Sequence, residues 1–157
     1  MAARVRYREF RFPVRVDWEG GRRTTARVEG KQPVRIATPP EFRGTDPELW
    51  SPEDAFVAAA ASCLAVTIAA LAQQDQLPVG ALSVEADGVV GHRPDGRFGF
   101  VRIEQSVELE TDPGLEGAAR ELVARAQDDC LVTISLDLPV HTNVRVRSAA
   151  VAAAVPS

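Results

Sequence analysis

Six stretches of the chain have the spacing of apolar and polar residues that is typical of β-strands. In the first stretch, apolar side chains stand at every second position from residue 10 to residue 16. The alternation has the opposite phase upstream, which predicts a register change or β-bulge near residues 8–10. The predicted strands are residues 4–18, 24–28, 34–37, 82–90, 98–110 and 140–147.

Two stretches between the strands have the pattern of helices. The first opens with Ser51, a helix-capping residue type, and with Pro52, which suits the first helical position. Glu53 and Asp54 add negative charge to its first turn. The second helix is predicted to start at residues 111–113 and to end at about residue 129. Its expected apolar face consists of Leu115, Ala118, Leu122 and Ala126.

The first helix contains no charged residue from position 55 to position 72. This run is long enough to span a membrane. Nine of its eighteen residues are alanine, and Ser62 and Thr67 lie inside it, so its transfer into lipid would be only weakly favourable. A helix that is apolar on all sides must then be covered by protein, which favours a dimer.

The order of the predicted elements, βββ-α-ββ-α-β, indicates an α+β fold with a mostly antiparallel sheet. The 157 residues contain no internal repeat and no linker-like stretch, so we expect one domain over residues 1–157, with a frayed alanine-rich tail at about residues 148–157.

Composition and charge narrow the possible functions. The formal net charge of −4 and the isoelectric point of about 5.2 argue against a dedicated nucleic-acid-binding protein. The arginine-rich start has no apolar segment behind it, unlike a secretory signal peptide, so a cytoplasmic location is expected. In that compartment a cysteine pair is more often redox-active than structural.

The chain has two cysteines, Cys63 in the uncharged helix and Cys130 just after the second helix. One interpretation is that both are small buried hydrophobic residues. The other is that they form a redox pair, in which a thiolate attacks a peroxide and a second thiol resolves the sulfenic acid.

The redox interpretation needs a cation beside the attacking thiol, because a thiol with a pKa of about 8.5 is mostly protonated at neutral pH. Arginine suits this role, and a carboxylate must hold it if it is buried. Arg22, Arg23 and Arg27 are the candidate cations, and Glu53 is the candidate carboxylate.

Other kinds of site have weaker support. Cys63, His92, Cys130 and His141 include zinc-ligand types, but their spacing matches no pattern of closely paired ligands. The chain has no serine-hydrolase elbow and no phosphate-binding glycine loop. We therefore expect no metal and no organic cofactor.

The segment from Trp50 to Phe56, with the sequence WSPEDAF, precedes the segment AASCL, residues 60–64. Together they resemble the signature of the OsmC/Ohr family, the osmotically inducible and organic hydroperoxide resistance proteins. The resemblance extends over about residues 14–147. One departure is that Cys130 is followed by Leu131, where much of the family has proline.

This resemblance implies an intertwined homodimer with central cysteine-bearing helices and sites at the dimer interface. It implies thiol-dependent reduction of organic hydroperoxides, with Cys63 as peroxidatic and Cys130 as resolving cysteine. Glu53 resembles the glutamate that pairs with a catalytic arginine, for which Arg22 is the best match and Arg23 the second. The implied reductant is an external dithiol, such as a lipoyl group.

Two further expectations follow. Glu53 and Cys63 are ten residues apart, about 15 Å along a straight helix, so we expect a kink at residues 58–62 or an arginine that reaches across. Phe42 and Trp50, in the loop before the helix, are candidates to line an apolar substrate pocket. The alternative function is a non-catalytic dimer of the same fold, which binds a small apolar ligand or serves as a stress-associated structural protein.

Overall fold

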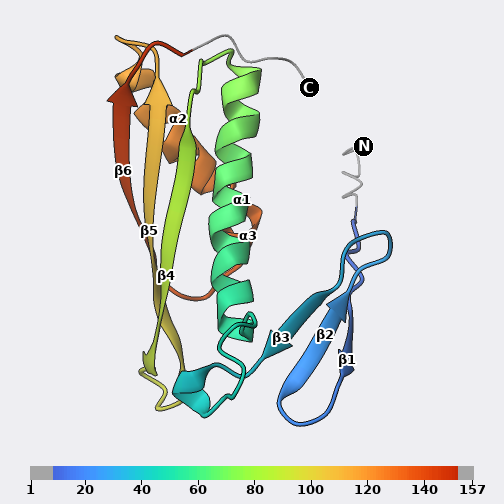
Figure 1. Ribbon diagram of the computed structural model, residues 1–157. Coiled ribbons are helices and arrows are strands. Elements are labelled where there is room, and N and C mark those ends of the chain that lie inside the picture. The colour runs from blue at the N-terminus through green and yellow to red at the C-terminus, as the bar shows by residue number, and fades with distance from the viewer. Residues whose placement is uncertain (1–8, 152–157) are drawn as a thin grey trace, which may run out of the picture. The chain divides into compact units, whose positions relative to one another are not determined.

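A computed structural model describes residues 9–151 of the chain. The chain divides into two compact units, residues 1–52 and residues 53–157, and each is described by itself below. The elements follow the predicted order βββ-α-ββ-α-β, with a short 3-10 helix and a one-turn helix added (Figure 1). The predicted α+β class is therefore confirmed.

The first unit is an antiparallel three-stranded sheet followed by a loop. Strands β1 (Arg15–Trp18), β2 (Arg23–Arg27) and β3 (Val34–Ala37) pair in sequential order. A 3-10 helix, η1 (Pro40–Phe42), lies in the loop after β3. The chain then returns to the sheet, where the backbone N–H of Ala37 donates to the carbonyl of Trp50 at 2.8 Å. This bond ties the segment that precedes the long helix to the edge of the sheet.

The first predicted strand is only partly confirmed. β1 covers four residues, and residues 9–14 have no regular structure because no neighbouring strand pairs with them. The bulge predicted near residues 8–10 falls partly outside the described residues.

The second unit combines a helix, a sheet and a helical crossover. Helix α1 (Pro52–Gln74) leads into β4 (Leu82–His92) and β5 (Phe98–Thr111). These two strands pair antiparallel, with a bulge between Val89 and Val90. Helix α2 (Glu116–Asp129) and the one-turn helix α3 (Leu131–Ile134) carry the chain to β6 (Val140–Ser148), which pairs parallel to β5.

Alternate residues of β5 form the inner face of this sheet, and both long helices pack on that face. The core includes Val107 and Leu109 of β5 together with a single stripe of α1, residues Ala60, Leu64, Ile68 and Ala72. The buried stripe of α2 consists of Ala119, Leu122, Val123 and Ala126. The predicted face of α2 is therefore right for Leu122 and Ala126 and wrong for two residues. Ala118 is exposed, and Leu115 lies before the helix.

Most of the surface of α1 is not covered by the residues that the structure describes. By length and composition alone the helix could cross a membrane. In the structure, 22% of its most apolar window is buried. The buried stripe packs on a sheet and a second helix, as a helix of a protein core does. The apolar residues on its other sides include Val66, which is 64% exposed.

The aromatic residues of the first unit are also less buried than the sequence suggests. Phe12 is 81% exposed and Trp18 is 73% exposed. Among residues 9–52 the short sheet has no second layer, so the apolar side chains of β1 stay largely exposed there.

Candidate functional site

Both cysteines pack on the same hydrophobic core. Cys63 lies in the middle of α1 and is half-buried, and its side chain packs against the core cluster. Cys130 is a fully buried member of that cluster. Both thiols are free. Two residues that are 67 positions apart in the sequence thus pack on one core cluster.

Cys130 occupies the junction between α2 and α3. Its extended backbone conformation ends the first helix and starts the second. Its carbonyl accepts hydrogen bonds from the backbone N–H of Ile134 at 3.1 Å and from the hydroxyl of Thr133 at 3.2 Å. One helical turn therefore holds the buried cysteine in place.

Glu53 lies in the first turn of α1, and the predicted kink is wrong. The helix is unbroken from Pro52 to Gln74, because no glycine or proline interrupts it after its first residue. Glu53 and Cys63 are therefore about 15 Å apart along the helix axis. The carboxylate does not simply face solvent, since its Oε2 is buried and has no hydrogen-bond partner among the described residues.

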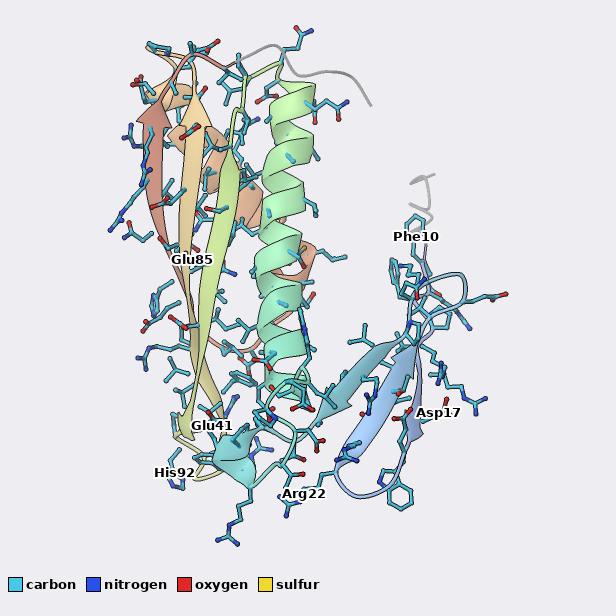
Figure 2. The ribbon with its side chains drawn as sticks, in the orientation of Figure 1. Phe10, Asp17, Arg22, Glu41, Glu85 and His92 are labelled. Carbon is cyan, nitrogen blue, oxygen red and sulfur yellow. The ribbon has the colours of Figure 1, made fainter. Side chains whose placement is uncertain are left out.

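Arg22 lies in the turn between β1 and β2, at the end of the strand pair where it is labelled in Figure 2. Its Nη1 donates to the carbonyl oxygens of Phe42 at 2.7 Å and of Arg43 at 3.1 Å. Its own carbonyl accepts from the backbone N–H of Thr38 at 3.1 Å. Within residues 9–151, Arg22 has no carboxylate partner, so its charge is held by the loop but is not neutralised.

The two other candidate arginines are already paired within their own unit. Arg23 forms an ion pair with Asp46 at 2.6 Å, which lowers the pKa of Asp46 and raises that of Arg23. Arg27 contacts Asp17 at 3.4 Å. Of the three, Arg22 is the one without a carboxylate partner in the described part of the chain, and its role as the site arginine stays a prediction.

The loop predicted before the first helix contains a tight turn that holds Arg22. The carbonyl of Pro39 accepts from the backbone N–H groups of both Phe42 and Gly44, at 3.0 and 2.9 Å. Arg43 has a positive φ of 64°. A Cβ atom on Gly44 would overlap the carbonyl of Thr38, so only glycine fits there. The signal in the sequence was the pair of prolines followed by this glycine.

Phe42 and Trp50 are both exposed side chains of the first unit, at 38% and 53%. Their backbones have structural roles: the Phe42 carbonyl holds Arg22, and Trp50 pairs with the edge of β3. Their contribution to a substrate pocket stays a prediction.

The two histidines form no metal-binding group with the cysteines in the described part of the chain. His92 ends β4 and packs edge-on against Phe98, with ring centroids 5.5 Å apart, and His141 is exposed on β6. In the described part of the chain, no three histidine, cysteine or acidic side chains are grouped so that they could hold a metal ion.

Similarities to known proteins agree with this architecture. A family model described as OsmC-like protein matches residues 44–145. The uncharacterized protein YmaD of Bacillus subtilis is 28% identical over 127 residues, which cover 78% of this chain and 83% of that protein.

Solved structures of low sequence identity share the fold. An OsmC-like protein of unknown function from Vibrio cholerae has a TM-score of 0.79 at 18% identity, covering 87% of this chain and 100% of that one. An organic hydroperoxide resistance protein from Elizabethkingia anophelis has a TM-score of 0.71 at 17% identity, covering 90% and 100%. For the organic hydroperoxide resistance protein OhrB of Bacillus subtilis the TM-score is 0.60 at 20% identity, covering 87% and 98%.

Proposed function

Because the chain belongs to the OsmC-like family, we propose that it is a thiol-dependent peroxidase that reduces organic hydroperoxides. The observation that carries the proposal is the packing of two free cysteines against one core cluster. Two structural relatives are named organic hydroperoxide resistance proteins, which supports the choice of substrate class.

The proposed cycle uses only thiol chemistry. The Cys63 thiolate attacks an oxygen of the hydroperoxide, the O–O bond breaks, and the departing alkoxide takes up a proton to leave as an alcohol. The resulting sulfenic acid condenses with the Cys130 thiol, which releases water and forms a disulfide. An external dithiol, such as a lipoyl group, then reduces the disulfide by exchange and is itself oxidised.

We expect condensation to involve a local rearrangement around Cys130, which is fully buried. The segment that would have to move is short, since α3 contains four residues and is followed by a loop. A resolving cysteine acts only after the first step, so its burial in the reduced protein is compatible with the cycle.

We infer that Arg22 and Glu53 of one subunit activate Cys63 of the other in a homodimer. A chain of two hydrogen bonds from carboxylate through guanidinium to sulfur spans only about 6 Å. The unbroken helix separates Glu53 from the Cys63 of its own chain by about 15 Å, and helical side chains point back toward the N-terminus. The uncovered sides of α1 and the exposed apolar residues of β1 offer surface for such a dimer.

The test is the intact mass of the reduced protein after one equivalent of cumene hydroperoxide without added reductant. The proposal predicts a loss of two hydrogens, which is abolished by Cys63→Ser and by Cys130→Ser. The Cys130→Ser protein should instead gain oxygen on Cys63, whereas Cys63→Ser should be inert. An unchanged mass with both thiols free would contradict the proposal and favour a non-catalytic, ligand-binding member of the same fold.

We also propose a cytoplasmic location. The cycle starts with both cysteines reduced, and the cytoplasm keeps thiols reduced.

A further inference from the structure

The second unit contains a hollow that the proposed cycle does not use. It lies between the inner face of the β5–β6 sheet, α1, and the α2–α3 segment, and it has a volume of about 200 Å³. One water molecule needs only about 10–15 Å³ of such space. The hollow is therefore large enough for a small organic molecule.

One wall of the hollow carries a buried polar group that is only half satisfied. Gln105 of β5 is 4% exposed, and its Oε1 accepts a long hydrogen bond of 3.4 Å from the hydroxyl of Thr142. Its Nε2 is buried and has no partner among the described residues. An unpaired buried donor costs free energy, so an acceptor placed in the hollow that accepts from this amide would be stabilising.

The other lining residues indicate the chemical class of the molecule that would carry this acceptor. Aliphatic side chains, including those of Leu64, Leu138 and Val140, form the apolar part. Gln127 adds a second amide, and no lining residue is charged. An ion would lose its hydration there without a counter-charge, so a neutral molecule is strongly favoured.

We propose that this hollow binds a small neutral aliphatic alcohol, whose oxygen accepts from the Gln105 amide and whose alkyl group packs on the aliphatic side chains. The proposal goes beyond the peroxidase function and does not require it. Thr133 also lines the hollow, and its hydroxyl donates to the Cys130 carbonyl. A bound alcohol would therefore contact the turn that holds the buried cysteine.

The test is a titration of the full-length reduced protein with tert-butanol, followed by methyl and side-chain amide NMR. We expect saturable shifts of the methyl groups of Leu64 and Leu138 and of the Gln105 amide, with a Kd in roughly the millimolar range. Pivalate has the same branched alkyl group on a carboxylate, and it should produce no saturable shift at the same concentrations.

The matched variants are Gln105→Leu and Glu104→Gln. Gln105→Leu keeps a similar volume and removes the unpaired donor, so it should fold and bind tert-butanol about tenfold more weakly. Glu104 lies on the opposite, exposed face of β5, so Glu104→Gln should bind like the unmodified protein. Equal affinity in Gln105→Leu, equal binding of pivalate, or shifts that never saturate would overturn the proposal. No peroxide is added, so failure of the peroxidase proposal cannot affect the result.

Discussion

At the residue scale, the arginines of the first unit differ in what neutralises them. Arg23 has a carboxylate partner at 2.6 Å, whereas within residues 9–151 Arg22 donates only to backbone carbonyls. Carbonyl oxygens fix a guanidinium in position but leave its net charge intact. Neighbouring positions in the sequence thus differ in their surroundings: Arg23 is in an ion pair within its unit, and Arg22 keeps its net charge.

The ion pair of Arg23 makes a prediction about pH. Its guanidinium holds the pKa of Asp46 below the ordinary value of 3.8, so the folded state favours the ionised carboxylate. The stabilisation is therefore fully present above pH 3.8 and is lost as the pH falls through the lower folded-state pKa. Carboxyl-carbon NMR of Asp46 should give a midpoint below 3.8 that rises in Arg23→Gln. An unchanged midpoint in that variant would show that the pair has no such effect.

At the scale of elements, the loop of residues 38–44 determines where Arg22 lies. The loop is closed by two backbone bonds to the Pro39 carbonyl and is held against the β1–β2 turn by Arg22. Because a Cβ on Gly44 would overlap a backbone carbonyl, the loop must move if any other residue stands there.

Gly44→Ala should therefore lower the free energy of unfolding by roughly 2–4 kcal/mol, as changes that force a backbone shift do. Urea unfolding measures the difference. Gly117→Ala is the matched control, because nothing lies within 4 Å of its Cβ position in α2 and alanine favours a helix. That control should be neutral or stabilising, and a Gly44→Ala protein as stable as the unmodified one would show that the loop adapts freely.

The sequence predicted elements well where the pattern depends on local neighbours. It located the start of α1 and the bounds of β3. It failed where partners far along the chain decide the outcome. The alternation of residues 9–14 predicted a strand, but a strand also needs a neighbour to pair with.

The candidate site shows the same limit. Residue types and spacing proposed both cysteines and Arg22 for the site, which stays a prediction, but they did not predict that Arg23 is neutralised by Asp46, a residue 23 positions away. The expected kink in α1 came from assuming that Glu53 serves the cysteine of its own chain. The hollow beside Gln105 could not be foreseen, because it is formed by side chains from five separate elements and a loop.

At the scale of the whole molecule, the proposed exchange of site residues between subunits can be tested with mixed dimers. Cys63→Ser should be inactive, and Glu53→Gln should lose about tenfold or more in peroxidase activity. An equal mixture that is unfolded and refolded together should regain about a quarter of full activity, since half of the dimers would hold one complete site.

The contrary outcome is equally clear. If each site is built from one chain, no mixed dimer contains a complete site, and the activity of the mixture stays at the average of the two variants. Variants mixed without unfolding are the control, because their subunits have not been exchanged.

The parallel pairing of β5 with β6 has a consequence for how the protein is made. Glu104 pairs with His141, and the connection between them contains α2, α3 and Cys130. Such a long-range pairing forms late in folding, because the intervening chain must first be ordered. During synthesis, Cys130 therefore leaves the ribosome before the strand that completes its surroundings. The thiol that is fully buried in the finished protein therefore stays accessible to oxidation until β6 has paired with β5.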